Sequence, residues 1–355
     1  MDKSKGQLLQ EELTWKFPNI AKEAPEQIGP AKEFCEGYKD FLDRGKTERE
    51  CVARAVEILA GAGYVPYEAG CKYAAGDKVY FVNRKKSLIA TTFGTRPIDE
   101  GVRMNGAHID SPRLDLKPNP LYEKNDLAFF KTHYYGGIRK YQWGTTPLAM
   151  HGVIVKRSGE VVEVSIGEND EDPVFCISDL LPHLAAEQNA RTLKTGLKGE
   201  ELNVIIGSIP YLDEEELKEP VKLLALQLLN ERYGITEADF FRAEIEMVPA
   251  QKARDVGFDG SMIGAYGQDD RVCAYTALMA EIEAKQPSYT TVTILTDKEE
   301  TGSEGNTGLN SDYVLHYIES LAEMARRRPE ARIAEFHLPF IRCECSLRSD
   351  IFQRL

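Results

Sequence analysis

Acidic side chains follow directly on a β-branched segment of the chain. The alternation from Thr291 to Thr296 predicts a buried strand, and Asp297, Glu299 and Glu300 come next. Two adjacent carboxylates at a strand-to-loop corner can take different roles, one as a metal ligand and the other as a general base. The alternative is an ordinary solvated Glu-Glu pair on a surface.

A second segment pairs a histidine with a carboxylate. Residues 101–109 are predicted to form a strand, and His108 and Asp110 lie two positions apart at its end. Side chains at i and i+2 of a strand point the same way, so the two can lie side by side. A neighbouring carboxylate fixes the tautomer of a histidine and makes it a better metal ligand. A surface histidine beside an Asp-Ser-Pro turn is the alternative.

A third segment places Asp269 and Asp270 immediately before a predicted helix. Apolar residues at positions 272, 275, 279 and 282 indicate that this helix is amphipathic. An N-cap favoured by the helix dipole would explain one carboxylate. Two adjacent carboxylates are more than capping requires.

In this chain order, the three segments resemble the M18 family of metallo-aminopeptidases, the aspartyl aminopeptidase group, and its bacterial branch most of all. The resemblance runs from about residue 34 to about residue 313. Its longest strings are Gly106-Ala-His-Ile-Asp-Ser-Pro-Arg-Leu-Asp-Leu-Lys-Pro118 and Asp297-Lys-Glu-Glu-Thr-Gly-Ser-Glu-Gly-Asn-Thr-Gly308.

The resemblance implies a zinc-dependent aminopeptidase with two zinc ions per subunit. It assigns His108 as a ligand of one zinc and Asp110 as the carboxylate that orients it. Asp269 would bridge the two ions, Glu300 would bind the second, and Glu299 would be the general base. Histidine nitrogen and carboxylate oxygen suit zinc, and paired ions can polarise a carbonyl and activate water. The expected substrates are peptides, which lose N-terminal residues, with aspartate and glutamate as the expected preference.

The C-terminal sequence departs from the family. Members continue further and supply another aspartate ligand, in a Ser-Ala-Asp context, and a final histidine. Here residues 325–355 carry seven arginines and four acids, and Cys343 and Cys345 form a Cys-x-Cys that fits nothing in the family. Asp350 and His337 are weak candidates for the missing ligands. We expect a truncated chain, with a frameshift near residue 325 as one hypothesis.

Composition is that of an acidic enzyme. The 355 residues carry a net charge of −13, which argues against nucleic acid and anionic membranes as partners. The sequence contains no apolar run of 18 residues, so we expect no transmembrane helix. Its first residues lack the apolar segment of a signal peptide. The seven scattered cysteines predict reduced thiols and a cytoplasmic protein. Cys35, Cys51, Cys71 and Cys273 are expected to fill the core.

These segments need an α/β scaffold to bring them together. We predict a discontinuous, zinc-peptidase-like α/β catalytic domain from residues 1–118 and 250–355, with a β-rich dimerisation domain inserted at 119–249. Helices are expected at 31–43, 47–60 and 214–233, strands at 78–82, 87–93 and 239–248, and a hairpin at 152–166 that turns at Ser158-Gly159. By resemblance the chain is a homo-oligomer whose dimers assemble into dodecamers.

Two alternatives remain open at this point. A di-metal aminopeptidase of the M42 type shares the Asp-Asp-Arg and Glu-Glu patterns. A chain without its last two ligands could also be a catalytically inactive relic that acts as a dimerising or interaction module.

Overall fold

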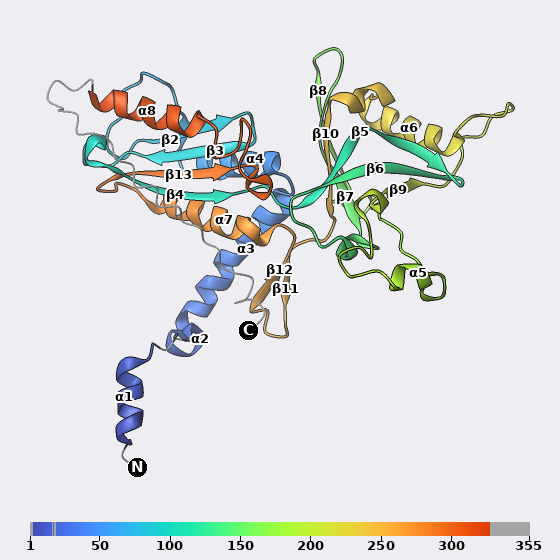
Figure 1. Cartoon of the computed structure of the whole chain (residues 1–355). Coiled ribbons are helices and arrows are strands. Elements are labelled where there is room, and N and C mark those ends of the chain that lie inside the picture. Colours follow the sequence, from blue (N-terminus) through green and yellow to red (C-terminus); the bar gives the residue numbers. More distant parts are fainter. Residues whose placement is uncertain (1–2, 16, 18, 327–355) are drawn as a thin grey trace.

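A computed structural model describes residues 3–15, 17 and 19–326. These form two main β-sheets with helices packed against them, while the first two helices extend away from the sheets (Figure 1). The first sheet has the strand order β1-β2-β3-β13-β4, and the second sheet has the order β8-β7-β10-β5-β6-β9. The predicted α/β class is therefore confirmed.

The strands of the first sheet are β1 (Val65–Pro66), β2 (Lys78–Asn83), β3 (Ser87–Thr92), β4 (Val102–His108) and β13 (Thr290–Thr296). Those of the second sheet are β5 (Arg113–Lys124), β6 (Leu127–Tyr135), β7 (Leu148–Val155), β8 (Val161–Ile166), β9 (Val204–Gly207) and β10 (Ala243–Pro249). A separate hairpin is formed by β11 (Arg254–Val256) and β12 (Met262–Gly264).

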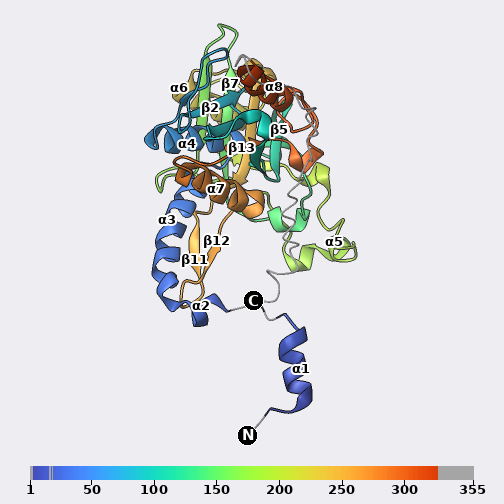
Figure 2. The same cartoon turned by 90° about the vertical axis from the view of Figure 1, so that its left-hand side faces the viewer.

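The α-helices are α1 (Lys5–Leu13), α2 (Ile20–Glu23), α3 (Ile28–Arg44), α4 (Glu48–Gly61), α5 (Ala186–Asn189), α6 (Pro220–Tyr233), α7 (Gln268–Glu283) and α8 (Tyr313–Arg326). The hairpin β11-β12 lies beside α3 (Figure 2), where Lys39 Nζ pairs with Asp255 Oδ1 at 2.9 Å. No helix among the described residues is long and apolar enough to cross a membrane.

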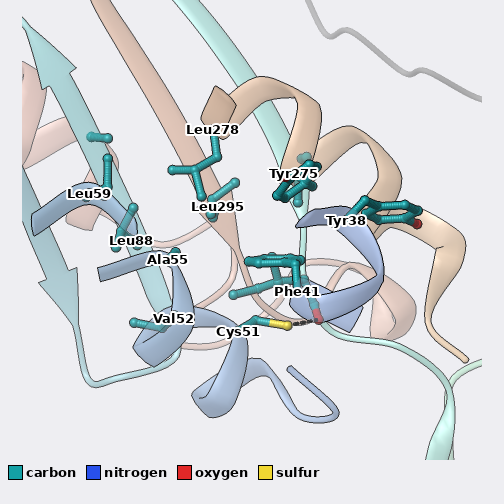
Figure 3. Close-up of a cluster of buried hydrophobic side chains, with 14 of the residues drawn as sticks. Tyr38, Phe41, Cys51, Val52, Ala55, Leu59, Leu88, Tyr275, Leu278 and Leu295 are labelled. Atoms are coloured by element: carbon teal, nitrogen blue, oxygen red, sulfur yellow. Dashed lines mark hydrogen bonds between the residues drawn. The ribbon is translucent and has the colours of Figure 1, made fainter. Parts of the chain in front are cut away.

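Both faces of the first sheet are covered along β3 and β13, where nearly every residue is buried. On one face, Leu88 and Leu295 pack against α3, α4 and α7 through Phe41, Leu59 and Leu278 (Figure 3). On the other face, side chains of β2, β3 and β13 pack against Tyr317, Ile318 and Leu321 of α8.

Helix α7 forms where it was predicted, and three of its four predicted apolar positions face the core, because Tyr275 is buried and Met279 and Ile282 pack against the same cluster. Val272 is 38% exposed, whereas Arg271, Ala274, Leu278 and Glu281 are buried. The two charged side chains can be buried because they have partners. Arg271 Nε donates to the Ile109 carbonyl at 3.0 Å, and Glu281 accepts hydrogen bonds from threonines of β3 and β13.

The second sheet has its own core and confirms the predicted hairpin. Strands β7 and β8 pair antiparallel around the turn at Ser158-Gly159, and the core includes Leu114, Phe130, Met150 and Met247. Helix α6 starts at Pro220 rather than at 214, and a 3-10 helix over Glu237–Arg242 precedes β10. The proposed domain limits at 119 and 249 remain a prediction. Strand β5, which belongs to the second sheet, begins at Arg113, six residues before the first of these limits.

The cysteines follow the prediction in part. None of the five in the described part of the chain forms a disulfide, and Cys51 is buried. Cys71, however, is exposed, so its assignment to the core is wrong. Cys343 and Cys345 lie outside the described residues.

A buried histidine joins the start of α4 to the second sheet. Thr47 caps α4 in a capping box with Glu50, and the Glu50 carboxylate also binds His151 of β7, with Oε1 2.8 Å from Nδ1. On the other side, His151 Nε2 lies 3.0 Å from Glu168 Oε1. Burial lowers the pKa of His151, but Glu168 and Glu50 outweigh it and raise the pKa to about 9.

We expect His151 to make the stability of the fold depend on pH. Its proton is bound with a pKa of 6.5 in the unfolded chain and about 9 in the folded protein. The resulting stabilisation is fully present below pH 6.5 and is lost as the pH rises through about 9, a loss on the order of 2–3 kcal/mol. Urea unfolding across this range measures it.

The variant His151→Gln cannot ionise, so its free energy of unfolding should lack this decline with pH. His133→Gln, at an exposed position of β6, is the matched control and should behave like the parent chain. Parallel pH curves for the parent chain and His151→Gln would contradict the prediction.

Candidate metal and catalytic site

The candidate site lies where two parallel strands of the first sheet end together. Strands β4 and β13 pair in parallel, with His108 opposite Thr296. The Ile109 amide donates to the Thr296 carbonyl at 2.9 Å, which extends the pairing by one residue. Both polar segments therefore leave the sheet at the same edge, the usual place for functional groups in α/β proteins.

The ring of His108 has a carboxylate on each side. Its Nδ1 lies 3.0 Å from the Asp110 carbonyl oxygen and 3.3 Å from Asp110 Oδ1. Its Nε2 lies 3.3 Å from Asp269 Oδ1 and 3.6 Å from Glu299 Oε2. Burial lowers the pKa of His108, but Asp110 and Asp269 raise it to about 10. The Asp110 contact leaves Nε2 facing the other acids, as a metal ligand would require.

Asp110 is the buried centre of the site. Its Oδ1 accepts the Glu299 amide at 3.2 Å, and its Oδ2 accepts the Glu300 amide at 3.2 Å and the Tyr135 hydroxyl at 2.7 Å. Burial raises its pKa, but the hydrogen bonds with His108 and Tyr135 prevail, so the pKa is lowered and the carboxylate stays ionised.

Asp269 and Asp270 lie at a kink in the first turn of α7. Gly267 occupies the N-cap position, while Asp269 and Asp270 have non-helical backbone angles and a cis peptide bond between them. The Asp269 side chain is 89% exposed and faces His108, and Ser111 Oγ donates to the Asp269 carbonyl at 3.1 Å. The Asp269 side chain is thus directed at His108, while an N-cap role for the pair stays a prediction.

Glu299 and Glu300 belong to a tight 3-10 turn, Glu299–Thr301, between Lys298 and Gly302, both with positive φ. The side chain of Glu299 is 54% exposed and can reach solvent. Burial raises the pKa of Glu300. The turn lets adjacent residues present both amides to Asp110, while the Glu299 carboxylate faces His108 and the Glu300 carboxylate lies against Gly136.

The structure thus brings His108, Asp110, Asp269 and the Glu299–Glu300 turn together, and it adds Tyr135, whose role sequence reasoning missed. The aromatic and glycine-rich run at 133–137 is equally typical of core or interface packing, so it gives no signal of this role. Asp350 and His337 lie outside the described residues.

The donor types fit zinc, but the described residues do not complete a site. One imidazole nitrogen and several carboxylates converge, which is a suitable mixture for zinc. Within residues 3–326, apart from 16 and 18, no group of three or more His, Cys, Asp or Glu side chains is arranged to hold a metal ion.

Comparison with known proteins decides the family. The family profile described as Aminopeptidase I zinc metalloprotease (M18) matches residues 41–339. The chain belongs to the M18 family. The match continues past residue 325, where the sequence was expected to depart from the family, and the family it names is M18 rather than M42.

Curated M18 relatives are similar over most of the chain. A probable M18 family aminopeptidase 1 from Clostridium acetobutylicum is 50% identical over 300 residues, which cover 83% of this chain and 64% of that protein. Its counterpart from Thermotoga maritima is 49% identical over 294 residues, 82% of this chain and 63% of that protein. The chain therefore spans less than two thirds of the length of these relatives.

Solved M18 structures have the same fold. The M18 aminopeptidase crystal structure from Thermotoga maritima has a TM-score of 0.83 at 45% identity and covers 89% of this chain and 68% of that one. Aminopeptidase I from Clostridium acetobutylicum has a TM-score of 0.80 at 47% identity, covering 87% of this chain and 69% of that one. The structure of the S. cerevisiae mApe1 dodecamer covers 83% of this chain and 67% of that one, and it shares the fold at 19% identity and a TM-score of 0.64.

The buried hydrogen bonds of Asp110 predict the effect of a near-isosteric change. In Asp110→Asn, either orientation of the amide places its NH2 group against a backbone N–H, because each Asp110 oxygen accepts one. An unsatisfied buried donor costs about 1–3 kcal/mol, so the free energy of unfolding should fall by that amount. Urea unfolding measures it.

Asp170→Asn, on an exposed loop, makes the same chemical change without the buried partners and serves as the control. Equal stability of both variants would show that Asp110 does not carry the interactions described.

Proposed function

We propose that this M18 chain is a zinc-dependent aminopeptidase that removes N-terminal residues from peptides. The observation that carries the proposal is the convergence on His108 Nε2 of two carboxylates from distant segments, at 3.3 Å for Asp269 and 3.6 Å for Glu299. Ion pairing alone gives little reason to collect several acids around one buried histidine at a strand end, whereas metal-assisted hydrolysis needs such a set.

His108, Asp269 and Glu300 are the proposed zinc ligands, with two ions per subunit as the proposed complement. Zinc, when bound, would act as a Lewis acid toward the scissile carbonyl and lower the pKa of water. Asp110 would hold the His108 ring through Nδ1, so that Nε2 stays directed at the site.

Glu299 is the proposed general base. Its carboxylate is half exposed at the edge of the site, so a water molecule can reach it, while its backbone is fixed on Asp110. A carboxylate oxygen of Glu299 would take a proton from the attacking water and later deliver it to the departing amine. The two amide hydrogen bonds to Asp110 would restrict where that oxygen can lie.

Substrate preference, assembly and location are finer proposals. We propose peptides that begin with aspartate or glutamate as the preferred substrates. We also propose a homo-oligomer in which the second sheet mediates dimerisation and dimers form dodecamers, in keeping with the dodecamer of yeast mApe1. We propose a cytoplasmic location, which fits the lack of disulfides among the described cysteines.

One observation favours a second candidate function. Because the described residues do not form a complete metal-binding group, this chain could be an inactive relic that binds partners through its second sheet. A site lacking ligands binds zinc more weakly and would not sustain turnover.

Release of free amino acid from Asp-, Glu- and Leu-initiated peptides separates the two functions. We expect turnover with added zinc, its loss with a chelator, and faster release from the Asp and Glu peptides. Absence of turnover by folded, zinc-supplied protein would overturn the aminopeptidase proposal for this chain and support the relic. Equal rates for the three peptides would remove only the acidic preference.

Glu299→Gln tests the general base. The amide cannot accept the proton, so kcat should fall by about 10²- to 10⁴-fold. The control Glu304→Gln makes the same change in charge at an exposed position five residues along the same loop and should retain the parent rate. Equal rates for the parent chain and Glu299→Gln would remove Glu299 from the mechanism.

A further inference from the structure

One residue of the second sheet, Tyr135, contacts the centre of the site. Tyr135 is the last residue of β6, yet its hydroxyl donates at 2.7 Å to Oδ2 of Asp110, which follows β4 of the first sheet. Both side chains are buried. A hydrogen bond to an ionised acceptor is stronger than a neutral one and has narrower geometry.

The ring of Tyr135 is itself held in place. The Arg113 guanidinium lies over it, 3.8 Å from the ring centroid, and Arg113 is the residue of β5 that pairs with Tyr135. Arg113 is fixed in turn by Glu246 of β10 at 3.2 Å and by Glu48 of α4 at 3.4 Å. The hydroxyl of Tyr135 is therefore presented by a rigid, buried charge cluster.

Gly136, the next residue, has no side chain, and this allows Glu300 to lie close to its backbone. A Cβ added at Gly136 would lie 2.8 Å from Glu300 Oε2 and 3.1 Å from Glu300 Cβ, and Gly136 has a φ of +73°. Both the space and the backbone angle favour glycine. Glu300 thus rests directly against the backbone at the end of β6.

We infer that Tyr135 and Gly136 form a positioning element by which the second sheet fixes the Asp110 carboxylate and the Glu299–Glu300 turn. Asp110 accepts the amides of both glutamates, so the Tyr135 hydroxyl limits where this turn can lie. Gly136 fixes the position of the Glu300 side chain from the other direction. The kinetic part of this inference rests on the proposed function, and the structural part does not.

The test compares Tyr135→Phe with Tyr134→Phe. Both remove one hydroxyl from β6, but Tyr134 is exposed and lies on the opposite face of the strand. In Tyr135→Phe, amide hydrogen exchange at Glu299 and Glu300 should accelerate about 10- to 100-fold, the range for losing a bond to a charged group. Exchange in β3 and β13 should stay at the parent rate. Tyr134→Phe should change neither.

The kinetic measurement compares the effect of Tyr135→Phe on kcat with its effect on KM. If Tyr135 and Gly136 position the proposed base Glu299, Tyr135→Phe should lower kcat by about 10- to 100-fold and leave KM unchanged. Loss of a hydrogen-bond partner behind a reacting group has an effect of this size. If the parent chain proves inactive, the proposed function fails, but hydrogen exchange still decides the positioning inference.

Gly136→Ala supplies an independent variant. It should also accelerate exchange at Glu300, because the methyl group displaces that side chain, whereas Gly137→Ala should not, since a Cβ there meets nothing within 4 Å. Parent-like exchange at Glu299 and Glu300 in both Tyr135→Phe and Gly136→Ala would overturn the inference. Exchange that rises equally throughout the first sheet in Tyr135→Phe would also overturn it, because it would indicate a merely structural role.

Discussion

The arrangement of the site depends on one buried carboxylate that must stay charged. Asp110 is fully buried, and burial alone would favour its neutral form. It stays ionised because His108, the Tyr135 hydroxyl and the amides of Glu299 and Glu300 all direct hydrogen-bonding groups at it. These donors come from three separated segments, so satisfying one charge fixes the relative positions of the proposed ligands and base.

This constraint explains why the first sheet alone would be insufficient. The parallel pairing of β4 and β13 brings His108 and the glutamate turn to one edge, but it does not determine how the turn faces the histidine. That orientation comes from Asp110. The Tyr135 hydroxyl that donates a hydrogen bond to Asp110 belongs to the second sheet. The interface between the sheets carries further buried charges, with Arg113 between Glu48 and Glu246. Such pairs contribute little net stability but disfavour other relative placements, because misplacement would leave a buried charge unpaired.

Local patterns predicted the elements well and their contacts less well. The β-branched run before Asp297 was sufficient to predict a strand, because periodicity is a local property. That its end meets His108 followed only from the resemblance to the family. Counting apolar residues placed Tyr275, Met279 and Ile282 of α7 at the core. It did not predict that Arg271 and Glu281 are also buried, because partners far away in the chain stabilise them. For Asp269, the sequence predicted a helix start but not the non-helical backbone that turns its side chain toward His108.

Tyr135 marks the limit of sequence reasoning most clearly. A tyrosine in an alternating strand is well explained as core or interface, and nothing local relates it to an aspartate 25 positions earlier, in the segment that follows β4. Only the register of β5 with β6, which sets Arg113 opposite Tyr135, determines that the hydroxyl reaches Asp110. A shift of one residue in that register would turn the ring to the other face of the sheet and leave Asp110 with one donor fewer. The geometry of the site is therefore encoded as much by strand pairing in the second sheet as by the acidic motifs themselves.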